Sequence, residues 1–83
     1  MIPYSRQSIN KKDISYIIRV LKSDFLTQGP TVNQFEKKIS NLVKAKFAVA
    51  SNSGSSALHL ACLSLNLGPK DIVWTVPNTF AAT

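Results

Sequence analysis

The sequence predicts an α/β fold in which an extended segment and two helices precede a βαβ unit. Three observations lead to this prediction. Apolar residues recur at helical spacing in two segments before residue 46. Two short apolar runs, residues 47–51 and 72–76, have the length and composition of buried strands. A helical pattern lies between these runs, and strands joined through a helix lie parallel with a right-handed crossover.

The first expected helix covers about residues 11–23, after an extended stretch over residues 2–8. Asn10 and Asp13 have the spacing of an amino-terminal capping pair. Apolar residues then follow at the spacing of one helix face: Ile14, Ile17, Ile18 and Leu21. Residues 23–30 interrupt this spacing, so we expect a loop there.

The second helix is expected to start with Thr31 as its cap and to end near Lys44. Its apolar face consists of Val32, Phe35, Ile39, Leu42 and Val43. The third helix has Leu58, Ala61, Cys62 and Leu65 on one face, and Gly68 and Pro69 are its stop signal. We therefore expect two parts: residues 1–46 with two helices, and residues 47–83 with the βαβ unit.

The turn at Asn52–Ser56, between the first strand and the third helix, has the composition of a phosphate site. Its residues are small, and Gly54 has no β-carbon to keep a ligand away from the backbone. The first amides of a helix have no partner within the helix, and the helix dipole adds positive charge there. The alternative is an ordinary N-cap on a tight turn. The sequence matches neither the Walker-type nor the dinucleotide-binding fingerprint.

The expected topology favours the phosphate site over the ordinary cap. The loops Asn52–Ser56 and Pro77–Phe80 each follow a predicted strand. Ligands in open α/β sheets bind outside the carboxyl ends of the strands. Both loops are therefore expected to meet at one edge of the sheet.

The chain of 83 residues is long enough for one small domain, and its net charge of +6 can attract phosphates. A small basic nucleotide- or nucleic-acid-binding module is therefore one alternative function. The basic residues lie mostly opposite the apolar stripes and are not interleaved with aromatic residues. This favours solvated helix faces over a nucleic-acid interface.

Other features of the composition indicate a cytoplasmic protein without a membrane or nucleic-acid partner. No apolar run reaches the ~18 residues of a membrane helix, and the amino terminus lacks the apolar core of a signal peptide. The single Cys62 forms no internal disulfide and is expected to be a small buried thiol. His59 has no second ligand at metal-binding spacing, so no metal site is expected.

Four segments resemble the amino-terminal part of DegT-type aminotransferases: Gly29–Glu36, Ala50–Ala61, Leu67–Asp71 and Pro77–Thr83. The resemblance implies a fold type I transferase that depends on pyridoxal 5'-phosphate and acts as a homodimer. Its mainly parallel large domain begins at residue 47. Residues 2–9 and 21–29 resemble members that aminate C4 of a UDP-linked 4-keto-6-deoxy amino sugar, with glutamate as the donor.

The resemblance also implies roles for individual residues. Ser55 and Ser56 are the expected cofactor-phosphate ligands through their amides, and Phe80 is expected to stack on the pyridine ring. Without the resemblance, Phe80 is a core aromatic residue. The expected ligands of the sugar nucleotide are Tyr4, Asp24, Phe25, Leu26, Thr27 and Gly54. From the sequence alone, Asp24 is a solvated turn residue.

The family's catalytic lysine lies in a segment with no counterpart among these residues, so we assign no catalytic residue. We therefore expect an amino-terminal piece of the enzyme that is inactive alone. Some relatives have histidine in place of that lysine and are dehydratases, so this alternative stays open. A non-catalytic remnant of the enzyme also stays open.

Overall fold

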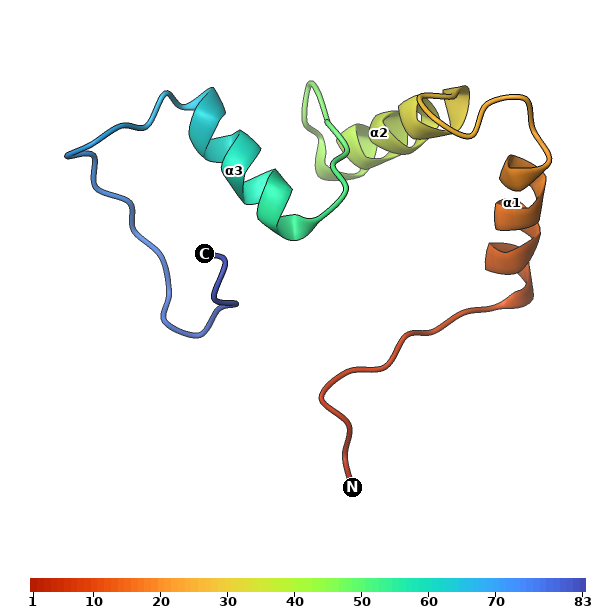
Figure 1. The fold of residues 1–83 in the computed structure, drawn as a ribbon, viewed down its shortest axis with the longest axis horizontal. Helices are drawn as coiled ribbons and strands as arrows, with labels where there is room; N and C mark the ends of the chain where they lie inside the picture. The colour runs from red at the N-terminus through yellow and green to blue at the C-terminus, as the bar shows by residue number, and fades with distance from the viewer.

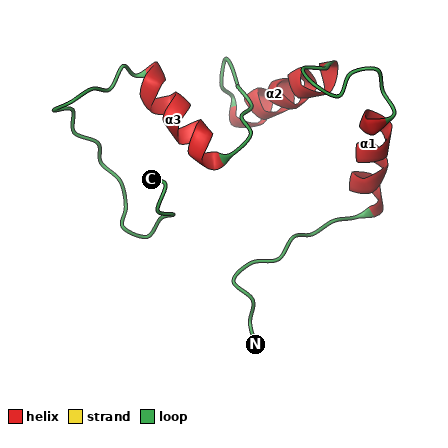
Figure 2. Cartoon of the chain, viewed as in Figure 1, coloured by secondary structure: helices red, strands yellow, loops and turns green.

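A computed structural model describes all 83 residues as three α-helices joined by turns and extended segments, with no β-strand (Figures 1 and 2). The helices are α1 (Lys11–Leu21), α2 (Pro30–Val43) and α3 (Gly54–Ser64). They follow one another along an open arc (Figure 1). The radius of gyration is 17.0 Å, whereas a compact domain of this length has about 12 Å. No apolar residue is buried, so the chain has no hydrophobic core.

Helix α1 begins with the predicted capping pair. The Asn10 side chain accepts a hydrogen bond from the Asp13 amide at 3.0 Å, and the Asp13 carboxylate accepts one from the Asn10 amide at 2.9 Å. This reciprocal pair satisfies two amides that the helix itself leaves unpaired. The prediction of a capped amphipathic helix is confirmed, although the helix ends at Leu21, two residues early.

Helix α2 begins two residues earlier than expected, because its cap position is Gly29, and the predicted Thr31 cap is wrong. Pro30 occupies the first helical position after Gly29, and no side chain caps this end. Proline suits this position because its fixed φ is helical and it has no amide to leave unpaired. At the other end, Lys44 has a left-handed φ of 55°. The amide of Ala45 then donates to the Ser40 carbonyl at 2.9 Å, which turns the chain back.

Helix α3 is capped by Ser53, whose side chain accepts a hydrogen bond from the Ser56 amide at 3.1 Å. The helix ends at Ser64, before the predicted stop signal. Asn66 takes a left-handed φ of 53°, and the Leu67 amide donates to the Cys62 carbonyl at 3.3 Å. Gly68 instead belongs to the following turn, in which its amide donates to the Asp71 carboxylate at 2.7 Å.

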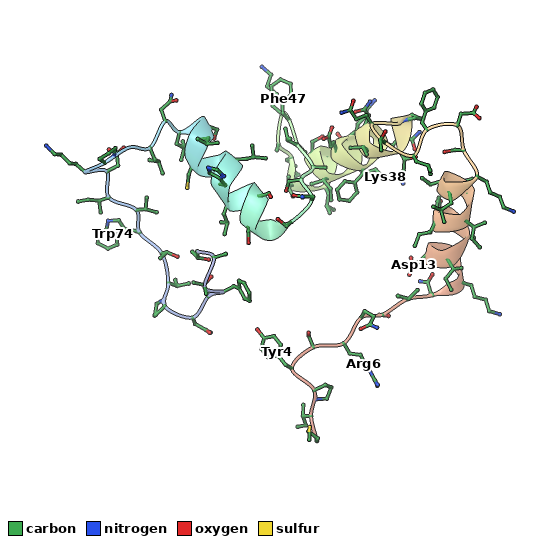
Figure 3. The ribbon with its side chains drawn as sticks, viewed as in Figure 1. Tyr4, Arg6, Asp13, Lys38, Phe47 and Trp74 are labelled. Carbon is green, nitrogen blue, oxygen red and sulfur yellow. The ribbon has the colours of Figure 1, made fainter.

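The predicted βαβ unit is not formed in this structure. Residues 47–51 and 72–76 have no strand pairing. Residues 72–76 are all exposed, and in residues 47–51 only Ala48 and Ala50 are partly buried. Trp74 is 93% exposed and lies on a stretch with no neighbouring element (Figure 3). A strand needs a partner for its backbone groups, and apolar strands of a parallel sheet need cover on both faces. The chain folds without that partner or that cover, so these segments remain extended.

The helices do not pack against one another through extended interfaces. Their apolar residues are consequently exposed, including Ile17 on α1 and Leu42 on α2. Cys62, expected to be buried, is a free and exposed thiol. None of the three helices has both the length and the apolar character required to cross a bilayer.

Helix α2 and the segment that follows it are joined by a hydrogen bond between residues far apart in the sequence. We call residues 45–50 the return segment, since the chain reverses at Lys44 and leads back along α2. Ser40 is buried, and Glu36, Ala48 and Ala50 are partly buried. The Ala50 amide donates to the Glu36 carboxylate at 2.9 Å. This is the only hydrogen bond in the chain between residues more than five positions apart.

Candidate functional site

The amino terminus of α3 has two backbone donors without a protein acceptor. Ser53 occupies the cap position, where its side chain accepts from the Ser56 amide and its carbonyl accepts from the Ala57 amide at 3.0 Å. The amides of Gly54 and Ser55 make no hydrogen bond within the chain. With the helix dipole, these two amides form a small centre of positive potential.

A hollow of about 650 Å³ lies beside this helix end. Gly54, Ser55 and Leu58 line it from α3, and Thr79, Phe80 and Thr83 line it from the carboxyl-terminal segment. Two tight turns bring that segment back, with the Thr79 amide donating to Pro77 and the Thr83 amide donating to Phe80, both at 3.0 Å. The hydroxyls of Thr79 and Thr83 lie 2.9 Å apart. One open hollow is therefore lined both by two residues with unpaired amides and by an aromatic residue.

The structure brings together three of the residues expected at the cofactor and sugar sites: Gly54, Ser55 and Phe80. Ser56 is not among the residues that line the hollow, and its amide is bonded to Ser53. The reason is the helix cap, because the amide at this position is the one that an N-cap side chain reaches. The two alternatives from the sequence, a phosphate site and an ordinary cap, both describe part of this turn. Ser53 caps the Ser56 amide, and the Gly54 and Ser55 amides remain unpaired.

The residues of this hollow fit a phosphate group attached to a flat ring. The Gly54 and Ser55 amides are free to donate, and the Ser55 hydroxyl makes no hydrogen bond within the chain. No aspartate or glutamate lines the hollow, so no acidic side chain opposes an anion there. Phe80 is 80% exposed, which leaves its face open to another aromatic ring.

The residues expected to bind the sugar nucleotide do not join this hollow, except for Gly54. Asp24, Phe25, Leu26 and Thr27 lie exposed in the loop between α1 and α2. Tyr4 lies on the amino-terminal tail, far along the arc from that loop (Figure 3). The helices between these segments do not pack, so nothing in the fold brings the segments together. Their role remains a prediction.

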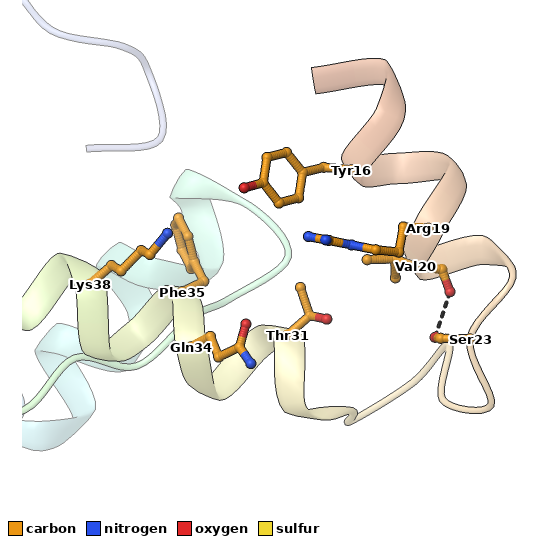
Figure 4. Close-up of a pocket in the computed structure, with 8 residues that line it drawn as sticks. All are labelled: Tyr16, Arg19, Val20, Ser23, Thr31, Gln34, Phe35 and Lys38. Atoms are coloured by element: carbon orange, nitrogen blue, oxygen red, sulfur yellow. Dashed lines mark hydrogen bonds between the residues drawn. The ribbon is translucent and has the colours of Figure 1, made fainter. Parts of the chain in front are cut away.

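A second hollow, of about 590 Å³, lies between α1 and α2 (Figure 4). Tyr16 and Arg19 face it from α1, and Phe35 and Lys38 face it from α2. The Arg19 guanidinium lies 4.6 Å from the centre of the Tyr16 ring. Phe35 was expected on the apolar face of the second helix, but no site was predicted here, although each aromatic–basic pair is three positions apart on its helix. Their side chains are exposed, so we interpret this hollow as a gap between two unpacked helices.

No group of three histidine, cysteine, aspartate or glutamate side chains is close enough to hold a metal ion. The four acidic residues are Asp13, Asp24, Glu36 and Asp71, and three of them accept hydrogen bonds from backbone amides. Asp13 stabilises a helix cap and Asp71 a turn, whereas Glu36 binds an amide fourteen positions away.

Comparison with known proteins shows the family. The profile of the DegT/DnrJ/EryC1/StrS aminotransferase family matches residues 7–83. The chain belongs to this family. Membership implies the amino-terminal part of a fold type I transferase. The resemblance seen in the sequence motifs is thereby confirmed.

Several curated proteins are similar over the whole chain. A Methanocaldococcus jannaschii protein of unknown function is 43% identical over 99% of this chain and 21% of its own length. A Bacillus subtilis spore coat polysaccharide biosynthesis protein is 45% identical over 99% of this chain and 21% of its length. A Campylobacter jejuni UDP-4-amino-4,6-dideoxy-N-acetyl-beta-L-altrosamine transaminase is 45% identical over all of this chain and 22% of its length. The chain thus spans about a fifth of these relatives, and no solved structure matches it.

Proposed function

We propose that this chain provides the cofactor-phosphate site of a sugar aminotransferase that depends on pyridoxal 5'-phosphate. The family match and the name of the Campylobacter relative support the reaction class. The observation that carries the proposal is the position of the unpaired Gly54 and Ser55 amides, in a hollow that Phe80 also lines. These comparisons do not favour a basic nucleic-acid-binding module.

The chain's own residues have distinct parts in this proposal. The Gly54 and Ser55 amides donate to the phosphate, and the helix dipole stabilises its negative charge. The Ser55 hydroxyl is a further donor, and Ser56 contributes its amide when Ser53 releases it. Phe80 stacks on the flat ring and fixes its plane. When bound, pyridoxal phosphate would supply an aldehyde that accepts the amino group from the donor and a ring that delocalises negative charge.

The substrate assignment extends this proposal to the rest of the chain. We expect amination at C4 of a UDP-linked 4-keto-6-deoxy amino sugar, with glutamate as the donor, by a cytoplasmic homodimer. Tyr4 and the loop over residues 24–27 bind the sugar nucleotide, together with Gly54. In this arrangement residues 1–46 supply substrate contacts, and residues 47–83 begin the cofactor-binding domain. The 83 residues alone have no transaminase activity, because no lysine among them is assigned to the reaction.

The replacement Gly54→Pro tests the phosphate site directly. Proline removes the amide donor, and the first helical position accepts its ring. Ser53 has φ −158° and ψ 160°, a conformation that a following proline permits. The matched control is Gly54→Ala, which retains the amide, and a β-carbon there meets no atom within 4 Å.

The measurement is the affinity of the full-length gene product for pyridoxal phosphate and for pyridoxal, by absorption or fluorescence titration. We expect Gly54→Pro to weaken the binding of pyridoxal phosphate about tenfold to hundredfold, the effect of one charge-assisted hydrogen bond. Pyridoxal lacks the phosphate, so its affinity should not change. Equal affinity of the proline and alanine variants for pyridoxal phosphate excludes this amide as a phosphate ligand.

A further inference from the structure

The hydrogen bond between Glu36 and Ala50 suggests a role for a side chain that lies in a family-like segment but was given no function by the resemblance or by the hollow. Glu36 lies in the middle of α2 and is partly buried, although glutamate is usually exposed. Its carboxylate accepts the Ala50 amide at 2.9 Å, a charge-assisted hydrogen bond. No other side chain of α2 forms a hydrogen bond with a residue beyond the helix and its cap.

The position of Ala50 makes this bond important for the turn that follows. Ala50 lies three residues before Ser53, the cap of α3. Three residues of fully extended chain span at most about 11 Å. Fixing Ala50 against α2 therefore limits where Ser53, and with it the start of α3, can lie. No hydrogen bond joins α2 or the return segment directly to the turn at residues 51–56, so the bond at Ala50 is the nearest fixed point before this turn.

The return segment reaches Glu36 because of the way α2 ends. Lys44 in its left-handed conformation and the bond from the Ala45 amide to the Ser40 carbonyl reverse the chain. Ser40 is buried beneath this reversal, and Ala48 is partly buried on the way back. The cap of α2 thus sets the direction of the return segment, and Glu36 sets where it ends.

We infer that Glu36 is a positioning residue for the amino terminus of α3. By accepting the Ala50 amide, it holds the turn in place so that the Gly54 and Ser55 amides are preorganised for a phosphate. Preorganised donors bind an anion without first losing conformational freedom. This inference rests on the proposed function for the identity of the anion, whereas the tether itself does not depend on it.

The experiment compares Glu36→Ala, which removes the acceptor, with Glu36→Gln, which retains a side-chain oxygen at the same distance. The matched control is Asp13→Ala. This variant also removes a carboxylate that accepts a backbone amide at 2.9 Å, but on α1. The first readout is amide hydrogen exchange in the full-length gene product without cofactor. The Ser56 and Ala57 amides report on the turn, because both donate to Ser53.

We expect exchange at Ser56 and Ala57 to become about tenfold faster in Glu36→Ala and to change less than about twofold in Asp13→Ala. Glu36→Gln should restore most of the protection. Amides in the middle of α2 should keep their exchange rates, which distinguishes positioning of the turn from loss of the helix. The second readout is binding affinity. Glu36→Ala should weaken the binding of pyridoxal phosphate about tenfold and leave the affinity for pyridoxal unchanged.

The outcomes separate this inference from the proposed function. Unchanged exchange and unchanged affinity in Glu36→Ala overturn the inference and leave the proposed function intact. Faster exchange at the turn, in a protein that does not bind pyridoxal phosphate in its unaltered form, supports the tether and overturns the proposed function. Equal loss of protection in the turn and throughout α2 also overturns the inference, because Glu36 then stabilises the helix only.

Discussion

Residues 30–50 and residues 68–83 differ in how their shape is maintained. In the first region, the Glu36 side chain contacts a backbone amide fourteen positions away, and Ser40 is buried. In the second, every residue is exposed and every hydrogen bond joins residues at most four positions apart. The comparison indicates that a segment without regular secondary structure is held in place when a residue distant in the sequence accepts a hydrogen bond from its backbone. Apolar composition alone does not hold it in place.

The largest expected loss of stability comes from removing the Ala50 amide, which donates a hydrogen bond to Glu36. Ala50→Pro leaves the partly buried carboxylate without its partner, and we expect this to destabilise the returned conformation by about 2 kcal/mol. Nuclear Overhauser contacts between Glu36 and residues 48–50 measure the population of this returned conformation. The control is Val73→Pro in the second region, where the replaced amide makes no hydrogen bond. Persistence of the contacts in Ala50→Pro excludes the hydrogen bond as their cause.

Gly29→Ala tests the loop that leads into the first region. Gly29 is buried, and a β-carbon there lies 2.8 Å from the Phe25 β-carbon and 3.0 Å from its carbonyl oxygen. Because backbone must move, we expect a loss of about 1–2 kcal/mol in the stability of this loop, measured by amide exchange at the start of α2. Gly68→Ala, in the exposed region, meets no atom within 4 Å and should have no effect. A similar small effect for both variants contradicts the tight packing at Gly29.

Asn10→Ala tests a purely local contact outside both regions. The Asn10 side chain accepts the Asp13 amide, and its loss should reduce the stability of α1 by about 1 kcal/mol. Circular dichroism and exchange at the first turn of α1 report the change. Ser8→Ala is the control, since the Ser8 side chain makes no hydrogen bond. Exchange in α2 that changes as much as in α1 shows that the two helices are coupled.

The smallest effect is a gain in stability at the end of α2. Lys44 has a left-handed φ of 55°, which a β-carbon disfavours. Lys44→Gly should stabilise the chain reversal by about 0.5–1 kcal/mol, after allowance for the greater freedom of glycine in the unfolded chain. Slower exchange of the Ala45 amide measures this gain. Lys44→Ala retains the β-carbon and should show none, so equal slowing in both variants assigns the effect to the lost charge.

The sequence predicted those features that depend on neighbouring residues. The Asn10–Asp13 cap, the three helices and the turn before α3 follow from residues within a few positions of one another. The strands at 47–51 and 72–76 did not form, because a strand requires partners that local sequence does not specify. The Ser56 amide was assigned to a ligand but is bonded to Ser53, since both roles use the same donor.

Ser55 and Phe80 line one hollow, but not for the reason that led us to expect them at one site. The prediction relied on parallel strands that end at one sheet edge. In the structure, tight turns at Pro77–Thr79 and Phe80–Thr83 bring this segment to α3 without a sheet. The Glu36–Ala50 contact was not predicted, because no local pattern marks a glutamate whose partner lies fourteen residues away.

The hydroxyl of Ser53 has a consequence for how any anion arrives at α3. Its oxygen occupies the position from which a ligand oxygen would accept a hydrogen bond from the Ser56 amide. The Ser53 hydroxyl also donates a hydrogen bond to the Ser56 hydroxyl at 3.0 Å. The Ser53 side chain thus takes the place of a ligand oxygen and keeps the start of α3 ordered before an anion binds. An anion that accepts only from the Gly54 and Ser55 amides binds without any rearrangement. An anion that also accepts from the Ser56 amide must first displace the Ser53 hydroxyl.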